Sequence, residues 1–193
     1  PFVGGFDRRK NLLGALRAFA LAATKLPPEI GLAVCGGGKG DDETRRAADA
    51  LGSRVRFLGY VHDTDLPALM SGCEVFFFPS LFEGFGLPAL EAMACGAAVI
   101  SSSTTALPEV CGDAALLVDP SDAEAMAAAL MRACTDSDLR QRLRRLGVER
   151  AGNFSWAKTA RQTLALYGEV GRAIRVSAAP SPGARRTALS SSS

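Results

Sequence analysis

Histidine is nearly absent from the chain, since His62 is the only one among 193 residues. A zinc site built from several histidines and a Ser-His-Asp triad both need this residue, so neither is expected. The chain also lacks an apolar run long enough to span a bilayer, and it shows no signal-peptide pattern. Its hydrophobic content of 48% and charged content of 22% are those of an ordinary globular protein.

Paired cysteines and a strong net charge are also missing. The cysteines, at positions 35, 73, 95, 111 and 134, are odd in number, irregularly spaced and without a Cys-x-x-Cys pair. This pattern predicts reduced thiols in a cytoplasmic protein rather than a disulfide framework or a zinc site. The net charge of +2 argues against a nucleic-acid partner held through phosphate contacts.

Short apolar runs alternate with helical patterns through most of the chain. Strands are expected within residues 2–4, 30–38, 55–61, 74–80, 97–101 and 114–120. Helices are expected within residues 12–26, 41–52, 65–72, 88–96 and 122–134, and two more are expected to start at Ser137 and Ser155. Such alternation predicts an α/β fold, a Rossmann-like parallel sheet with helices on both faces. The run Phe76–Phe78 should be buried on both faces of that sheet.

The domain organisation is predicted from composition. We assign residues 1–175 to one domain, including the terminal helices. Near Val176 the composition changes to Ala, Pro, Ser, Gly and Arg, which predicts a disordered tail over residues 176–193. The opening "PFVGGFD" is typical of a strand already under way, so we expect an excised part of a longer protein.

Helix starts are predicted from residues that suit the first turn. Asn11 is expected to cap the helix that follows it, and Ser121 with Glu124 to form a capping box. Pro88 is expected at the first position of its helix, where its missing N–H does no harm.

The stretch "PSLFEGFGLPALEAMACG", residues 79–96, places a glycine-rich turn between a buried strand and a helix. Ligands of parallel sheets bind beyond the carboxyl ends of the strands, near a reversal of strand order. The first turn of a helix has free N–H groups and a partial positive charge, which suit phosphate or sugar oxygens. The candidate amides are those of Gly86, Leu87, Ala89 and Leu90.

Two carboxylates flank this turn. Glu83 lies in the loop, and Glu91 lies about one turn inside the helix, where its side chain leans toward the helix mouth. Carboxylates beside a phosphate-binding turn suit a ligand with hydroxyls and phosphates, such as a nucleotide sugar. One alternative is that both are solvated side chains and the glycines only shape the turn. Another is that they are the acid and nucleophile of a glycosidase.

The stretch "FFFPSLFEGFGLPALEAMACGAAVISSSTTALPEVCGDAALLVDP" resembles the donor-binding half of the retaining GT-B-type glycosyltransferases of family 4, the group 1 set. Glu83 and Glu91, with seven residues between them, match the family's pair of glutamates. The resemblance extends to "FVGGFDRRKN" and "FSWAKTARQTLALYGEV", and so covers about residues 1–172. It implies the carboxy-terminal half of a GT-B fold, without the amino-terminal half that carries the acceptor site.

The resemblance also implies roles for individual residues. Glu91 would bind the ribose hydroxyls, and the candidate catalytic residues would be Glu83, facing the donor sugar, and Lys10, neutralising the diphosphate. The remaining donor-binding candidates are the backbone of Gly84, Phe85, Gly86 and Leu87, and Val61 and Asp63 at the edge that binds the base.

The implied reaction is transfer of a hexosyl group with retention of configuration. We expect no metal or other cofactor, because Lys10 and the helix mouth would neutralise the leaving diphosphate. The implied partners are a nucleotide-sugar donor, an amino-terminal Rossmann-like half and a sugar or lipid-linked acceptor. One departure is Gly5, which stands where the family usually has an arginine, so Arg8 or Arg9 would have to supply that cation. The alternative is a nucleotide-sugar-binding or regulatory module without transfer activity.

Three further features have plainer interpretations. "CGGGKG", residues 35–40, is similar to a phosphate-binding loop but lacks its Ser or Thr, which favours a simple glycine turn. The arginines of "LRQRLRRLGVER", residues 139–150, indicate a solvated helix face, with a patch for anionic lipid at the inner membrane face as the alternative. His62 is interpreted as a loop residue beside the base-binding edge.

Overall fold

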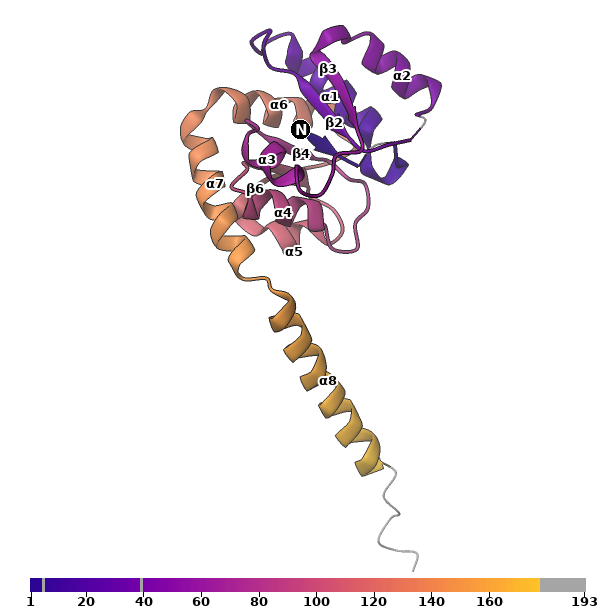
Figure 1. Ribbon diagram of the computed structural model, residues 1–193, viewed down its shortest axis with the longest axis vertical. Helices are drawn as coiled ribbons and strands as arrows, with labels where there is room; N and C mark the ends of the chain where they lie inside the picture. The colour runs from indigo at the N-terminus through magenta and orange to yellow at the C-terminus, as the bar shows by residue number, and fades with distance from the viewer. Residues whose placement is uncertain (5, 39, 178–193) are drawn as a thin grey trace, which may run out of the picture. The chain divides into compact units, whose positions relative to one another are not determined.

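The computed structural model describes residues 1–4, 6–38 and 40–177, and the chain divides into two compact units (Figure 1). The first unit is Pro1–Asn153, and the second begins at Phe154. The described part of the second unit contains helix α8 (Trp156–Ser177). The Ser155 hydroxyl accepts the Lys158 N–H at 3.2 Å, so the predicted start of this helix is confirmed. The tail predicted for residues 176–193 lies outside the described residues, apart from the last two residues of α8.

In the described residues of the first unit, short strands alternate with helices. The strands are β1 (Phe2–Val3), β2 (Leu32–Cys35), β3 (Val55–Gly59), β4 (Phe76–Phe78), β5 (Val99–Ser102) and β6 (Ala115–Val118). The α-helices are α1 (Leu12–Ala23), α2 (Asp42–Asp49), α3 (Leu66–Ser71), α4 (Leu87–Ala94), α5 (Leu107–Cys111), α6 (Ala123–Thr135) and α7 (Ser137–Gly152). Short 3-10 turns are η1 (Arg8–Lys10), η2 (Gly52–Arg54) and η3 (Gly112–Ala114).

The strands form a parallel, Rossmann-like arrangement. One sheet has the order β1-β2-β3 and the other the order β4-β5-β6, with every pair parallel. The Phe77 N–H of β4 donates to the carbonyl of Pro1, just before β1, at 2.9 Å and joins the two sheets at their edges. The combined order is β3-β2-β1-β4-β5-β6, in which the chain order reverses between β1 and β4. The predicted fold class is therefore confirmed.

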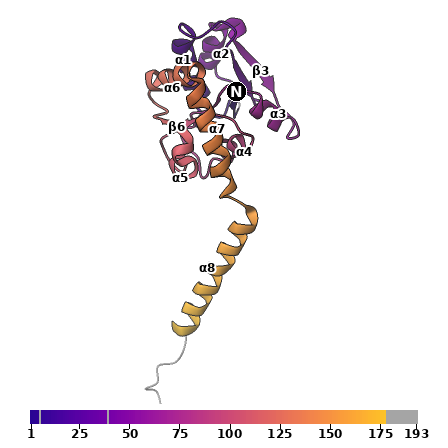
Figure 2. The same ribbon diagram turned by 90° about the vertical axis from the view of Figure 1, so that its left-hand side faces the viewer.

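The phenylalanine run of β4 is buried on both faces of the sheet, as predicted. Phe77 belongs to the hydrophobic core that α1 and α6 cover, whereas Phe76 and Phe78 belong to the core on the side of α4 and α5. Successive side chains of a strand point to opposite faces, so three consecutive phenylalanines serve two cores. Helix α7 lies beside α4 at the edge of the second core (Figure 2).

The cap of α6 differs from the prediction by one residue, and the start of α7 is confirmed. The capping box of Ser121 and Glu124 is wrong, because Asp122 precedes α6 and its carboxylate accepts the N–H groups of Glu124 and Ala125. Helix α7 begins at Ser137, as predicted, and the carboxylate of Asp136 before it is the cap. In both places an aspartate competes with a neighbouring serine, and its charged oxygen is the stronger acceptor at a helix N-terminus.

Arg54, at the end of η2, holds together the segment that links α1 to β2. Its guanidinium donates to the carbonyl of Ala23 at 2.6 Å, to that of Pro27 at 3.0 Å and to that of Ile30 at 2.8 and 3.1 Å. It also lies 5.5 Å from the ring centre of Phe19. One side chain therefore hydrogen-bonds three carbonyls of this segment, and the Pro27 carbonyl also accepts the Ile30 N–H at 3.0 Å.

Replacing Arg54 by alanine is expected to lower the free energy of unfolding by about 2–4 kcal/mol, because several charge-assisted hydrogen bonds are lost together. Urea denaturation followed by circular dichroism measures this change. The matched control is Arg56→Ala, on the exposed part of β3, with an expected effect within about 0.5 kcal/mol. Equal effects of the two substitutions would contradict the role given to Arg54.

Candidate functional site

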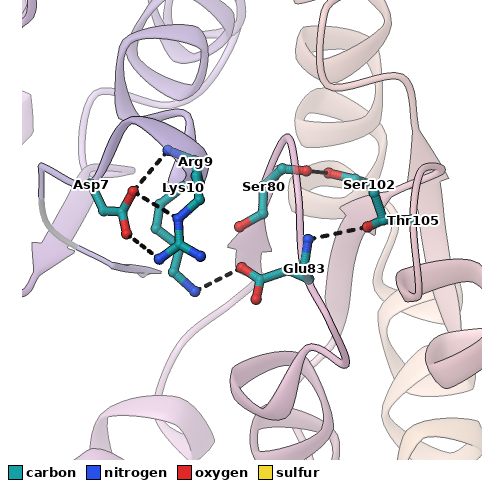
Figure 3. Close-up of polar contacts among 7 residues, drawn as sticks. All are labelled: Asp7, Arg9, Lys10, Ser80, Glu83, Ser102 and Thr105. Atoms are coloured by element: carbon teal, nitrogen blue, oxygen red, sulfur yellow. Dashed lines mark hydrogen bonds and ion pairs between the residues drawn. The ribbon is translucent and has the colours of Figure 1, made fainter.

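The two candidate catalytic residues, Lys10 and Glu83, meet where the strand order reverses. Lys10 ends η1 after β1, and Glu83 lies in the loop after β4. The Lys10 Nζ donates a hydrogen bond to the Glu83 Oε1 at 2.7 Å (Figure 3). The two side chains are only 18% and 13% exposed, and Nζ lies 4.9 Å from the ring centre of Phe78. Because water reaches this ion pair only in part, salt screens it less than a surface pair.

Gly4 makes room for the Lys10 side chain. A Cβ at Gly4 would lie 2.5 Å from the Lys10 Cγ, and the Gly4 φ of +143° is itself unfavourable for other residues. The Gly4 N–H donates to the Cys35 carbonyl at 3.0 Å, which fixes the backbone where the lysine passes. The glycine is thus part of what directs Lys10 toward Glu83.

Asn11 ties together the carboxyl ends of two strands instead of capping α1. It occupies the cap position with φ +62°, but its side chain makes no cap hydrogen bond. The Nδ2 group donates to the carbonyl of Pro79 at 3.1 Å and to that of Pro120 at 2.7 Å. The predicted side-chain cap is therefore wrong, because these two long-range carbonyls take the amide. The result is a fixed start for the loop that carries Glu83.

Hydroxyl side chains at the end of β5 hold the same loop. The Ser102 hydroxyl donates to the Ser80 carbonyl at 2.5 Å, and the Glu83 N–H donates to the Thr105 hydroxyl at 3.2 Å (Figure 3). Thr105 has a φ of +57°, which is uncommon for a β-branched residue. Sequence reasoning missed these residues, although the run of hydroxyl residues 101–105, which starts within β5 and continues past its end, was a signal.

The glycine turn has one open and one crowded position. At Gly84 an added Cβ would have nothing within 4 Å, whereas at Gly86 it would lie 2.4 Å from the Leu107 Cδ2. Gly86 also has φ +100° and immediately precedes α4. Phe85 and Leu87 beside it are 41% and 43% exposed, so the turn presents apolar surface as well as backbone.

The mouth of α4 offers fewer amides than the sequence indicated. The N–H groups of Ala89 and Leu90 both donate to the Gly86 carbonyl, at 3.1 and 3.3 Å. These two N–H groups are therefore used in hydrogen bonds at the start of the helix, and the prediction that they are available to a ligand is wrong. For the predicted amides of Gly86 and Leu87 no backbone partner is found among the described residues, so these two remain for a ligand. Helix α4 begins at Leu87, so Pro88 takes its second position rather than its first.

Glu91 and Asp63 line one cavity of about 440 Å³ between α3 and α4. The other lining residues are Leu66, Pro67, Met70, Ala94 and Cys95. Glu91 is exposed toward this space, on the second turn of α4. Two carboxylates on a partly apolar wall suit a hydroxylated ring system, since carboxylates accept from hydroxyl and amino groups. Val61 is half-buried in the chain before Asp63 and is not among the residues that line the cavity.

The two arginines near the predicted diphosphate position differ in their surroundings. Gly5 lies outside the described residues. Arg9 donates to Asp7 through Nη2 at 2.7 Å and Nε at 3.3 Å, and this hydrogen bonding raises the pKa of Arg9 and lowers that of Asp7. The charge of Glu83 also contributes to the raised pKa of Arg9, so Arg9 lies within electrostatic reach of the site. Arg8 is exposed on the same turn.

Neither a thiol nucleophile nor a metal cluster is found in the described part of the chain. Burial raises the pKa of every cysteine thiol, and at Cys95 the Glu91 charge adds to the effect, so thiolates are disfavoured. The described cysteines are all free. Two Asp-x-Asp triplets occur, at residues 63–65 and 136–138, but Asp136 is a helix cap. Among the described residues no group of three or more potential ligands is placed to hold a metal ion.

The alternative interpretations can now be compared with the geometry. Glu83 is paired with a cation and Glu91 lines a cavity with Asp63, whereas the two carboxylates of a glycosidase face the same bond. In the "CGGGKG" turn, a Cβ at Gly40 would lie 2.3 Å from the Phe6 ring, so packing explains that glycine. His62 is exposed in a turn, 3.0 Å from the Thr64 hydroxyl.

Three of the five arginines of α7 make hydrogen bonds to backbone carbonyls. Arg140 donates to the carbonyls of residues 133 and 134 and pairs with Glu74 at 3.0 Å, Arg144 donates to the Cys73 carbonyl, and Arg150 donates to the carbonyls of residues 109 and 110. Arg142 and Arg145 are exposed. Among the described residues no helix combines the length and apolar character needed to cross a membrane.

A further cavity, of about 370 Å³, lies at the opposite end of the sheet. It is mostly apolar and is lined by residues that precede β2 and β4, such as Gly31 and Val75. Ligands of parallel sheets bind at the carboxyl ends of strands, so the Lys10–Glu83 end of the sheet is the candidate site.

Comparisons with known proteins agree on one family. The family model described as "Glycosyl transferases group 1" matches residues 1–150. An O-antigen chain mannosyltransferase B of Escherichia coli is 38% identical over 169 residues, which cover 86% of this chain and 44% of that protein. A phosphatidyl-myo-inositol mannosyltransferase of Mycolicibacterium smegmatis is 34% identical over 179 residues, covering 91% and 46%.

Solved structures agree with these matches. A sucrose-phosphate synthase of Thermosynechococcus elongatus superposes with a TM-score of 0.73 at 34% identity, covering 90% of this chain and 46% of that one. An α,α-trehalose 6-phosphate synthase of Burkholderia multivorans gives a TM-score of 0.78 at 20% identity, covering 95% and 44%, which supports the fold alone. These structures are GT-B glycosyltransferases. The chain thus spans less than half the length of each of these proteins.

Proposed function

The chain belongs to the group 1 glycosyltransferase family, and we propose that it binds a nucleotide-diphosphate sugar for transfer of the hexosyl group with retention. The observation that supports this donor role best is the shielded Lys10–Glu83 ion pair at the reversal of strand order. A cation there suits the diphosphate, and a carboxylate beside it suits the hydroxyls of the sugar.

The proposed chemistry is electrostatic. Negative charge develops on the leaving diphosphate as the bond to the sugar breaks, and the Lys10 ammonium would stabilise that charge. The free amides of Gly86 and Leu87, at the positive end of the α4 dipole, would add to this. Glu83 would position the donor sugar, and Glu91 would hold the ribose in the cavity that it shares with Asp63. In this mechanism no metal ion is needed for charge neutralisation.

Transfer of the sugar to an acceptor would require a second domain. Because the named relatives are about twice as long as this chain, we propose that an amino-terminal Rossmann-like half supplies the acceptor site. A sugar or lipid-linked acceptor is in keeping with the names of those relatives. The proposed location is the cytoplasm, where the exposed Arg142 and Arg145 would be available for contact with anionic lipid.

The donor role and the missing acceptor role are tested on the chain alone. Calorimetry with GDP, UDP and ADP should show binding of at least one, and an assay with nucleotide sugars and a panel of acceptors should show no acceptor-dependent release of nucleoside diphosphate. Holding two reactants in place contributes about 7–11 kcal/mol to such reactions, which a donor site alone cannot supply. Binding of none of the three would refute the donor role. Strong acceptor-dependent release would refute the two-half proposal.

A second candidate is a donor-binding module that transfers nothing even in the longer protein. This candidate is favoured by the small number of cations available to the diphosphate. Glycine stands at position 5, where the family usually has an arginine, and Arg9 is hydrogen-bonded to Asp7. Transfer by the longer protein separates the two functions, since a module would bind donor as tightly but never turn it over.

Replacing Glu91 by alanine is expected to weaken binding of a nucleoside diphosphate by about 1.5–3 kcal/mol, the range for hydrogen bonds to a charged group. Calorimetry on the wild type and the variant measures the loss. Inorganic pyrophosphate is the control ligand, and its affinity should stay unchanged because it has no ribose. Equal nucleotide affinities of the two proteins would remove Glu91 from the site.

A further inference from the structure

Ser80 has a buried hydroxyl that nothing in the described part of the chain satisfies. The residue follows β4 by two positions and is 0% exposed, and its Oγ has no hydrogen-bond partner among the described residues. Buried polar groups in folded proteins nearly always have a partner, so an orphaned one calls for an explanation. A partner that arrives only with a ligand is one such explanation.

The backbone around Ser80 is fixed, which restricts where the hydroxyl can turn. Its carbonyl accepts the Ser102 hydroxyl at 2.5 Å, and the next N–H, that of Leu81, donates to the Arg9 carbonyl at 2.7 Å. In Figure 3 the Ser80 hydroxyl points away from Ser102, toward the side on which Lys10 and Glu83 meet. The orphaned hydroxyl and Glu83, the acidic member of the ion pair, therefore belong to the same short loop, three residues apart.

A diphosphate at this site would compete with Glu83 for the Lys10 ammonium. The Glu83 carboxylate, 13% exposed, would then lose its cation and stand beside an anionic ligand. A partly buried carboxylate in that position is costly unless a hydrogen-bond donor replaces the cation. A serine hydroxyl is such a donor and adds no charge that would compete for the phosphate.

We propose that, when a bound diphosphate pairs with the Lys10 ammonium, the Ser80 hydroxyl donates a hydrogen bond to the Glu83 carboxylate in place of Lys10. This hydrogen bond keeps Glu83 directed at the donor sugar. Ser80 is then a positioning residue that acts through Glu83. This inference rests on the proposed donor role of the site. It explains why the hydroxyl has no hydrogen-bond partner among the described residues.

The test compares stability with affinity. Ser80→Ala should leave the melting temperature of the ligand-free chain unchanged or slightly raised, because its hydroxyl has no partner to lose. Its affinity for the tightest-binding of GDP, UDP and ADP should fall roughly tenfold, the size of one hydrogen bond to a charged group. The exposed Ser103, changed to alanine, is the matched control and should alter neither quantity.

A double-mutant cycle shows whether Ser80 acts through Glu83. In the Glu83→Gln background no carboxylate needs a donor, so Ser80→Ala should there change affinity less than about twofold. A tenfold loss in both backgrounds would mean direct contact with the ligand and would overturn the proposal. Unchanged affinity of Ser80→Ala, or a lowered melting temperature, would also overturn it. If the wild type binds none of the three nucleotides, the donor role fails and this inference fails with it.

Discussion

Lys10→Met is expected to abolish most of the affinity for a nucleoside diphosphate and to leave the affinity for the matching nucleoside unchanged. The lost interaction is with phosphate charge, and a hydrogen bond to a charged group contributes about 1.5–3 kcal/mol. Methionine keeps an apolar chain against Phe78, so the substitution removes the ammonium with little loss of packing. Titrating both ligands against both proteins by calorimetry measures the difference.

The same substitution is expected to destabilise the ligand-free chain, because Glu83 then keeps a partly buried charge without its cation. We expect a loss of about 1–3 kcal/mol in the free energy of unfolding. The matched variant Lys10→Met/Glu83→Gln removes both charges and should recover most of that stability, but not the diphosphate affinity. Its measurement thus separates a binding defect from a folding defect.

Two results would contradict this account of Lys10. An equal loss of affinity for nucleoside and nucleoside diphosphate would indicate a general folding defect. Full diphosphate affinity in the double variant would place the phosphates away from Lys10, with Arg8 or Arg9 as the cation that holds them.

Gly86→Ala is expected to lower the free energy of unfolding by about 2–4 kcal/mol, through positive-φ strain and overpacking together. The backbone at this position has φ +100°, and the added methyl group would lie 2.4 Å from the Cδ2 of the fully buried Leu107. Because Gly86 immediately precedes α4, the strain also displaces the amides of the helix mouth. Urea denaturation measures the stability change.

Gly84→Ala is the paired control, two residues earlier in the same turn. A Cβ there has nothing within 4 Å, and its φ is not positive, so stability should change by no more than about 0.5 kcal/mol. Its affinity for a nucleotide sugar should nevertheless fall, since the methyl group occupies space proposed for the donor. A stable Gly86→Ala variant would contradict the first expectation. Unchanged donor affinity of Gly84→Ala would place the ligand elsewhere.

The sequence by itself determined the fold class and most of the elements, because these follow from local patterns, but it did not predict the short helix α5 (Leu107–Cys111). Alternation of apolar and helical runs predicted the strands, and three consecutive phenylalanines predicted a strand buried on both faces. The spacing of Glu83 and Glu91 around a glycine turn identified the candidate site and its family resemblance. Each of these signals lies within about twenty neighbouring residues, where backbone geometry fixes which side chains can share a face.

Only the tertiary structure decided which groups pair. Lys10 and Glu83 are 73 positions apart, and Asn11 lies 109 positions from the Pro120 carbonyl that it holds, so their contacts depend on strand order rather than on local spacing. Local rules chose Asn11 as a cap and Ser121 as part of a capping box, but the amide of Asn11 is bound by distant carbonyls and Asp122 is a stronger acceptor than Ser121. A polar side chain takes the best partner within reach, and the fold determines which partners those are. Only the tertiary structure also identified the orphaned Ser80 hydroxyl, because burial without a hydrogen-bond partner is a property of the packed chain and not of the sequence.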